Sequence, residues 1–458
     1  MDDPTSTDLS PTQGISEYIV RSSYDDLPDE VINKAKMCIL DSLGCATGGS
    51  TLEPGKILLG LITEMQGKPE STIIPKGPKV PAIHAAYVNS SLANLVEFDD
   101  VGRGHAGSCT VPPALAVAER VGASGRELIK AVVLAYEVHA RIADAIKSSP
   151  QRDKQVRGMS TQLTFAAVTA ASALLHLDAE TTATAFGLAG TNAPVPSIWK
   201  MLEARPKSWL KFNIGWASMG GVLAALLAER GFIGNQAILD GDKGFWVMAG
   251  SDQCNFEEMT RGLGQEYRIL DVISKPYPCG RVLHSSIDAI KQILTEHDVR
   301  PGSVEKVHVK SISMLKGFMD YAPRNCIDAE FSLPYVMAMS LLDKPPGSQW
   351  LSEATLRDPE VLAIAQKVAF EFDPEAERVF YEKNWREFPV TVTLLAGGKE
   401  FSASVSHPKN LTGVELEQKF RQLSIPVLGA SVTEEVIIAV RQLEDLTQVT
   451  SLMQLFHH

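Results

Sequence analysis

The sequence predicts a mainly α-helical protein in which a large all-helical domain carries a smaller inserted α+β lid domain. From residue 15 to about residue 265, apolar residues recur at the three- and four-residue spacing of helices. Beyond that point strand-like alternation appears between helical segments, and from residue 412 the pattern is helical again. We expect a disordered tail over residues 1–13, an all-helical domain over 14–265 and 411–458, and the α+β lid over 266–410.

The helical elements follow in order along the chain. The first strongly periodic helix starts at Pro28, and Gly44, Gly48 and Gly49 are expected to end it. Its successors are apolar on several faces and rich in small residues, which predicts burial in a close-packed interior or at a dimer interface. These further helices are expected over residues 81–97, 112–121, 127–146, 160–177 and 222–230.

The lid elements show a different pattern. Residues 304–312 alternate between apolar and polar side chains, as a half-buried strand does. Two further alternating segments, residues 390–395 and 401–405, flank an Ala-Gly-Gly-Lys-Glu turn and predict a β-hairpin. Helical segments are expected between these strands, over residues 332–342 and 359–369.

Composition excludes several classes of function. The chain has 458 residues, of which 45% are hydrophobic, so it is long enough for a large core. Its 43 Lys and Arg against 55 Asp and Glu give a net charge of −12, which argues against a nucleic-acid partner but not against one basic cleft for a small anion. The six cysteines form no Cys-x-x-Cys pair, so neither a disulfide framework nor a zinc ribbon is expected.

No membrane contact is expected either. The N-terminus is acidic and polar and lacks the pattern of a signal peptide. The longest uncharged stretch, residues 158–177, contains several Ser, Thr and Gln residues, which favours a buried helix over a membrane span. We therefore expect a soluble, intracellular protein, placed in the cytoplasm with the organelle left open.

Familiar cofactor and metal motifs are missing from the sequence. It contains no GxxxxGK[ST] loop, no complete dinucleotide-binding GxGxxG and no HExxH. Its ten histidines form no close ligand pair except the terminal two. We therefore expect no cofactor and no metal ion.

One constellation of residues suggests proton-transfer chemistry. The sequence Glu97-Phe98-Asp99-Asp100 is followed by Arg103 and His105 in a glycine-rich corner between two apolar helices. Glycines allow a ligand to approach the backbone, and a carboxylate beside an imidazole can act as a general acid/base pair near neutral pH. The same spacing is compatible with aspartates that cap a turn and a histidine buried in the core.

Two other segments carry candidate cations. Arg157 precedes the uncharged helix, and Lys275 and Arg281 lie in a segment that two prolines and a glycine hold in shape. This segment, residues 275–284, marks the change from helical to α+β pattern, so its cations are expected either in an interdomain cleft or on a rigid linker.

At these residues the chain resembles the MmgE/PrpD superfamily, whose members dehydrate, decarboxylate or epimerise small di- and tricarboxylates. The resemblance implies a helical domain with an α+β lid, a homodimer, and a cofactor-free site at the domain interface. The matching segments are residues 35–49, 84–100, 135–141, 215–232, 275–284 and 328–343, together with His105 in its glycine-rich surround.

The resemblance also assigns site residues. The catalytic aspartate of the family falls on Asp99 or Asp100, its histidine on His105, and its interdomain lysine and histidine on Lys275 and His284. Candidate substrate-binding residues are Arg103, Arg157, Lys207, Lys211, Arg281 and Tyr321.

Two departures from decarboxylase-like members are visible. Arg157 stands where those members have a histidine, and Leu210 stands where they have a lysine. Lys211 and Lys207 are the neighbouring lysines that would supply this charge. Adjacent helical residues point about 100° apart, so neither is a simple replacement.

The expected reaction follows from these residues. Removing a proton or CO₂ beside a carboxylate builds negative charge, which cations stabilise while an acid/base group moves the proton. We expect a cofactor-independent lyase, a dehydratase or decarboxylase of a small polycarboxylate, with His105 moving the proton and Asp99 or Asp100 orienting it. Two alternatives stay open: an epimerase of a dicarboxylate such as iminodisuccinate, and a catalytically inactive homologue that acts as a binding protein.

Overall fold

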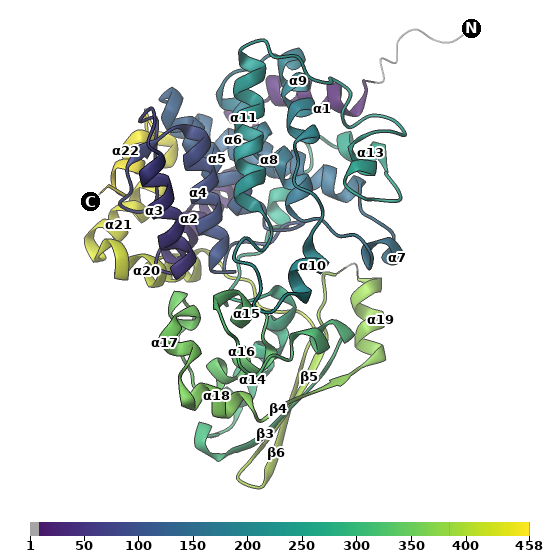
Figure 1. Ribbon diagram of the computed structural model, residues 1–458, viewed down its shortest axis with the longest axis vertical. Coiled ribbons are helices and arrows are strands. Elements are labelled where there is room, and N and C mark those ends of the chain that lie inside the picture. Colours follow the sequence, from purple (N-terminus) through teal and green to yellow (C-terminus); the bar gives the residue numbers. More distant parts are fainter. Residues whose placement is uncertain (1–8, 384, 458) are drawn as a thin grey trace.

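The computed structural model describes residues 9–383 and 385–457 and confirms the mainly helical fold class. Figure 1 shows a helical part above an α+β part, with the C-terminal helices α20 and α21 packed beside α2 in the helical part. The helical part contains α1 (Pro11–Arg21), α2 (Asp29–Gly49), α3 (Glu53–Met65), α4 (Ala82–Leu95), α5 (Ala106–Val121), α6 (Gly125–Ala145), α7 (Pro150–Asp153), α8 (Ser160–Leu174), α9 (Ala179–Thr191), α10 (Ile198–Glu203), α11 (Ile214–Glu229), α12 (Phe245–Met248), α13 (Phe256–Thr260), α20 (Gly413–Leu428), α21 (Ala430–Arg441) and α22 (Thr450–Gln454).

The α+β part lies between α13 and α20 in the chain, and the chain then returns to the helical part, where α20 packs on α2. A four-stranded sheet and the helices around it form this part (Figure 1). Its elements are α14 (His284–Glu296), β3 (Val304–Ser311), α15 (Cys326–Glu330), α16 (Leu333–Leu341), α17 (Glu353–Leu356), α18 (Pro359–Ala365), β4 (Val368–Phe372), α19 (Pro374–Glu382), β5 (Val390–Ala396) and β6 (Lys399–Val405).

Helix α8 lies at the centre of the helical part. It packs against α5, α6, α9 and α11, and every one of its residues except Gln162 is buried. This confirms that the uncharged stretch is a buried helix, because a helix enclosed on all sides needs no polar face. Within the described ranges no helix has the length and hydropathy needed to cross a bilayer.

Of the three glycines expected to end α2, Gly49 is its last residue, as predicted, but Gly44 and Gly48 do not end it. Helix α2 continues through Gly44 and Gly48 to Gly49. A Cβ on Gly44 or Gly48 would press against side chains of α20, and one on Gly49 would overlap the carbonyl oxygen of Leu92 in α4. These glycines therefore bring three helices together, and close packing outweighs their low helix propensity.

The sheet has the order β4-β3-β5-β6, with β3 parallel to β4 and antiparallel to β5. The predicted hairpin is confirmed: β5 and β6 are joined by Gly397 and Gly398, whose φ angles of 56° and 71° suit a tight turn between twisted strands. Alternate residues of β5 are buried, and α14 packs against both β5 and β6.

Some element boundaries differ from the predictions. The segment 359–369 is not one helix: α18 ends at residue 365 and β4 begins at residue 368, because the Val-Ala-Phe-Glu-Phe segment pairs with β3. The helical part also contains a short ribbon of β1 (Ser71–Thr72) and β2 (Lys79–Val80). Helix α5 starts six residues before Pro112.

The last residues of the tail expected over 1–13 belong to a helix. Residues 1–8 lie outside the described residues, and helix α1 already begins at Pro11. The Thr12 backbone N–H and hydroxyl both donate to Asp240 Oδ1, at 3.0 and 2.9 Å. Buried Ile15 and Ile19 add apolar contact, which holds this end of the chain against the helical part.

Substituting Gly49 tests the close approach of α2 and α4. We expect Gly49→Ala to lower the free energy of unfolding by about 1–3 kcal/mol, because the added methyl group must displace the backbone of α4. Gly60→Ala in α3, where a Cβ meets nothing within 4 Å, is the matched control and should raise stability slightly. Denaturant unfolding measures both, and an unchanged Gly49→Ala midpoint would contradict the packing.

Candidate active site

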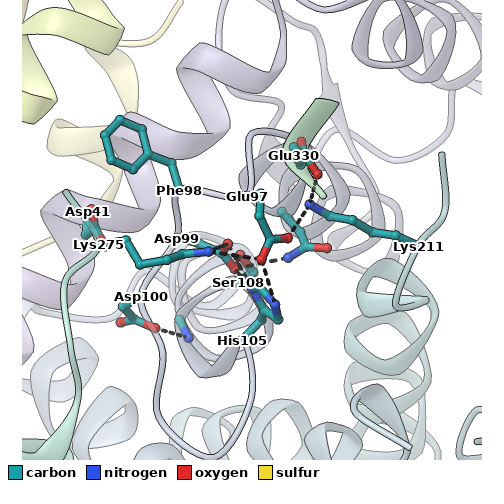
Figure 2. Close-up of polar contacts among 12 residues, drawn as sticks. Asp41, Glu97, Phe98, Asp99, Asp100, His105, Ser108, Lys211, Lys275 and Glu330 are labelled. Carbon is teal, nitrogen blue, oxygen red and sulfur yellow. Dashed lines mark hydrogen bonds and ion pairs between the residues drawn. The ribbon is translucent and has the colours of Figure 1, made fainter. Parts of the chain in front are cut away.

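The loop between α4 and α5 concentrates polar side chains at the meeting point of the two parts. Glu97, Arg103 and Gly104 have φ angles of 46°, 53° and 116°. Left-handed backbone is rare for residues other than glycine, and such strain is concentrated at functional sites. The loop turns sharply enough for Glu97, Asp99 and His105 to point toward one another (Figure 2).

Asp99 and His105 form a buried pair. His105 Nδ1 lies 3.0 Å from both carboxylate oxygens of Asp99. Ser108 Oγ and Asn94 Nδ2 also donate to Asp99 Oδ2, at 2.6 and 3.1 Å, which fixes the carboxylate. The imidazole stacks on Phe212, with ring centroids 4.6 Å apart. Both the position and the plane of the imidazole are therefore determined by its neighbours.

The Glu97 carboxylate is shared among three nitrogen-bearing side chains. Oε2 accepts from Lys211 Nζ at 2.6 Å, while Oε1 lies 3.1 Å from Lys275 Nζ and 3.4 Å from His105 Nε2 (Figure 2). Burial alone would raise the pKa of Glu97, but the charges of Lys211 and Lys275 outweigh it and lower the pKa to about 2. Burial likewise opposes ionisation of Asp99, yet His105 and Lys275 hold the pKa of Asp99 well below its usual value.

Glu330 of α15 is the second carboxylate on Lys211. Its Oε2 lies 2.7 Å from Lys211 Nζ, so Lys211 joins the α+β part to the loop of Glu97. One lysine cannot neutralise two buried carboxylates, and Glu97 has Lys275 as well. Burial, only partly offset by Lys211, raises the pKa of Glu330 to about 8. This shift favours the protonated form of Glu330.

Lys419 of α20 fixes the loop after α4 and the segment that contains Lys275 relative to each other. Its Nζ donates to the carbonyl oxygens of Phe98, at 2.5 Å, and Lys275, at 3.2 Å, and pairs with Asp41 Oδ1 at 2.6 Å. It also lies 4.1 Å from the centre of the Phe98 ring. Helix α20 thus places a buried cation between the loop after α4 and the segment that contains Lys275.

A cavity of about 820 Å³ opens beside this cluster, between the helical and α+β parts. Both parts contribute to its wall, as expected for a site at a domain interface. The expected site residues that line it are Arg103, His105, Arg157 and Arg281, and Glu97 joins them. Lys211 and Lys275 contact Glu97 from behind this wall.

Asp100 does not contact His105, unlike Asp99. Its oxygens accept from the backbone N–H of Gly107 at 2.8 Å and the Tyr136 hydroxyl at 2.5 Å. Burial raises the pKa of Asp100 to about 6. Of the two aspartates that the sequence left open, the geometry gives the orienting position to Asp99 and a role in fixing the start of α5 to Asp100.

His284 lies outside the cavity wall. Arg281 Nη1 is 3.2 Å from its Nδ1, and its Nε2 is 3.2 Å from the carbonyl oxygen of Cys279. These partners require a neutral ring that accepts at Nδ1 and donates at Nε2. Burial and the charges of Arg281 and Lys275 lower the pKa of His284 well below its usual value. The ring is therefore placed to orient Arg281 and not to exchange protons with a ligand.

Lys207 and Tyr321 are also outside the wall. Lys207 Nζ is buried 3.8 Å from Asp328 Oδ1, and burial together with Arg205 lowers the pKa of Lys207 to about 8. The Tyr321 hydroxyl donates to the carbonyl oxygen of Val368 at 3.0 Å, within the α+β part. Of the two lysines near Leu210, Lys211 is the one that joins the cluster.

The lining arginines already have partners. Arg103 Nε lies 3.0 Å from Asp144 Oδ2, and its Nη1 lies 3.1 Å from Asp271. Arg281 donates to the backbone carbonyl oxygens of residues 408 and 409, both at 2.8 Å, and burial lowers the pKa of Arg281 to about 10. Backbone carbonyls leave its positive charge uncancelled, so it is well suited to meet a carboxylate.

Arg157 joins the two sides of the cavity. Its Nη1 lies 3.3 Å from Asp153, and its guanidinium carbon is 3.5 Å from the centre of the Trp385 ring in the α+β part. Burial lowers the pKa of Arg157 to about 10, so it remains charged at neutral pH. Within the described ranges no three His, Cys, Asp or Glu side chains are grouped as a metal site.

Comparison with known proteins identifies the family. The MmgE/PrpD N-terminal domain matches residues 13–257, and the MmgE/PrpD C-terminal domain matches residues 277–445. The chain belongs to the MmgE/PrpD family. This MmgE/PrpD protein is 27% identical to the cis-aconitate decarboxylase of Homo sapiens, over 97% of this chain and 94% of that protein. It is 23% identical to the cis-aconitate decarboxylase of Aspergillus terreus, over 97% of this chain and 96% of that protein.

A third relative of this MmgE/PrpD protein is the cis-aconitate decarboxylase-like protein oryM of Aspergillus oryzae, which is 23% identical over 98% of this chain and 99% of that protein. The family resemblance seen in the sequence is thus confirmed over nearly the whole chain. The cluster around Glu97 adds side chains that the sequence had not selected, namely Glu97 itself, Phe212, Glu330 and Lys419.

Titration of Glu330 should be visible in stability. Because its folded pKa is raised to about 8, its stabilising contribution is complete below its unfolded pKa and is lost as pH rises through 8. Glu330→Gln, which still accepts from Lys211, should therefore gain at least about 1 kcal/mol of unfolding free energy relative to the wild type between pH 5 and pH 9.

Urea unfolding at both pH values measures this difference. The control is Glu353→Gln, an exposed glutamate of α17, whose difference from the wild type should not change with pH. A Glu330→Gln difference that stays flat between pH 5 and pH 9 would show that Glu330 is ionised throughout that range.

Proposed function

We propose that this protein is a lyase that dehydrates or decarboxylates a small di- or tricarboxylate by moving a proton at a carbon next to a carboxylate. The observation that carries the proposal is the Asp99–His105 pair at the cavity wall, backed by Glu97 and its two lysines. The match to cis-aconitate decarboxylases along almost the full chain supports the same class of reaction.

His105 is the proposed proton-transfer group. With its Nδ1–H donated to Asp99, the Nε2 atom keeps a lone pair that can accept a proton. Once Nε2 is protonated, the imidazolium lies between Asp99 on one side and Glu97 on the other, 3.4 Å from Nε2. Two carboxylates fixed in advance stabilise this charge without reorganisation during the reaction.

Arg281 and Arg157 are the proposed carboxylate anchors. A guanidinium can donate two parallel hydrogen bonds to one carboxylate, which fixes both the position and the orientation of the substrate. Both arginines line the cavity with His105. Lys275 and Lys211 act indirectly in this scheme, because their ammonium groups keep Glu97 ionised.

An epimerase of a dicarboxylate such as iminodisuccinate is the second candidate. One observation favours it: among the described residues that line the cavity, His105 is the single histidine, and Arg157 occupies the position expected for another. A charged arginine cannot serve as the acid that protonates a leaving group. The homodimer, the intracellular location and the independence of any cofactor remain predictions, and an inactive binding protein remains the third alternative.

Removing the imidazole tests the proton-transfer role. We expect His105→Ala to lower turnover by about two to four orders of magnitude, the usual contribution of general acid/base catalysis. His176→Ala, which removes an exposed imidazole outside the cavity, should leave turnover within about twofold of the wild type. A loss below about tenfold for His105→Ala would remove this residue from the proposed role.

The reaction class can be read by NMR in D₂O. The purified protein is incubated with cis-aconitate, 2-methylcitrate and iminodisuccinate in turn. A lyase gives new alkene signals on dehydration, or an altered alkene spectrum with CO₂ release on decarboxylation. Deuterium uptake at the carbon next to a carboxylate without net loss of substrate would instead support the epimerase. No change with any of the three would contradict both reactions on these acids.

A further inference from the structure

The cavity is larger than a small polycarboxylate needs. Its volume is about 820 Å³, whereas pockets of roughly 300–1,000 Å³ enclose drug-sized ligands. An acid of six carbons would fill only a small part of this space and leave most of the wall in contact with water. The chemical nature of that remaining wall therefore indicates what else the substrate carries.

A continuous row of aromatic rings extends from His105 along the wall. Phe212 stacks on His105, Phe331 lies edge-on to Phe212 with centroids 6.3 Å apart, and Phe318 lies 5.6 Å from Phe331. All four rings line the cavity. The apolar lining continues on both sides with Met159, Ile198, Trp199, Leu202, Met314 and Phe388.

The charges of the wall can anchor carboxylates, but they do not account for the remaining space. Five cationic side chains and four carboxylates line the cavity. Arg103 is held by Asp144 and Asp271, and Arg157 is paired with Asp153. Glu97 is compensated by Lys211 and Lys275, so the lining carboxylates are neutralised and Arg281 keeps its charge for a substrate carboxylate.

We propose that the substrate is a polycarboxylate with a large apolar alkyl or aryl substituent, which lies along the Phe212–Phe331–Phe318 row while His105 acts on the carbon beside a carboxylate. This inference rests on the proposed function and specifies the substrate class of the same site. The stacking of Phe212 on His105 places the apolar wall beside the reacting carbon. Burying such a substituent adds binding energy to that of the carboxylate anchors.

Binding of matched ligands tests the inference. The full-length protein is titrated by calorimetry with succinate, with 2-benzylsuccinate and with the neutral dimethyl ester of 2-benzylsuccinate. We expect 2-benzylsuccinate to bind at least about tenfold more tightly than succinate, because the phenyl group buries roughly 100 Å² of apolar surface at about 25 cal/mol per Å². The ester should bind at least about tenfold more weakly than the diacid, because it cannot form charge-assisted hydrogen bonds with the arginines.

Variants then locate the apolar contact. Phe318→Ala should remove most of the advantage of 2-benzylsuccinate and leave succinate affinity within about twofold. Met314→Ser, at a half-buried position on the same wall, provides a second variant if Phe318→Ala does not fold. Ile233→Ala, at a side chain 89% exposed and away from the cavity, should change neither affinity.

The outcomes separate this inference from the proposed function. Equal affinity for succinate and 2-benzylsuccinate would overturn the apolar substituent and leave the polycarboxylate lyase intact. An ester that binds as tightly as the diacid would overturn carboxylate recognition, and with it the proposed function. No binding of any of the three ligands would overturn both.

Discussion

Compensation of buried charge is the constraint on which this site depends. Glu97, Asp99, Lys211 and Lys275 are all almost inaccessible to solvent, and an unpaired charge at such depth would cost several kcal/mol. They are stable together because the Glu97 carboxylate lies between the two lysines and beside His105. Glu97 achieves this only in a left-handed backbone conformation, so the strain of the loop and the balance of the cluster are parts of one arrangement.

The same interactions link the two parts of the molecule. Lys211 connects the loop after α4 to α15. Lys275 lies two residues after Ile273, which exchanges two backbone hydrogen bonds of 2.9 Å with Val101 of that loop. Lys419 then fixes both segments from the helix that follows the α+β part. The geometry of the site therefore depends on contacts from the loop after α4, from the α+β part and from helix α20.

The limits of the sequence-based predictions follow from the range of the interactions involved. The hairpin and the buried helix α8 depend on local patterns, and these predictions were correct. Gly44 and Gly48 of α2 were misread because their partners lie in α20. Lys419 gave no signal at all, since its bond to Phe98 spans 321 positions of the chain. Glu97 lay within a recognised motif, yet its importance appears only when two distant lysines converge on it.

Arg157 shows how reaction and specificity are divided in this cavity. Stacked on Trp385 and paired with Asp153, it keeps a fixed positive charge and cannot shuttle a proton. In the proposed reaction, proton transfer at the wall therefore falls to His105, which lies between the carboxylates of Asp99 and Glu97. Which group of the substrate leaves or moves then depends on how the arginine anchors and the Phe212–Phe331–Phe318 row orient the substrate over His105 Nε2. Proteins with this fold can thus differ in reaction outcome because the residues of the cavity wall differ, while the cluster around Glu97 stays the same.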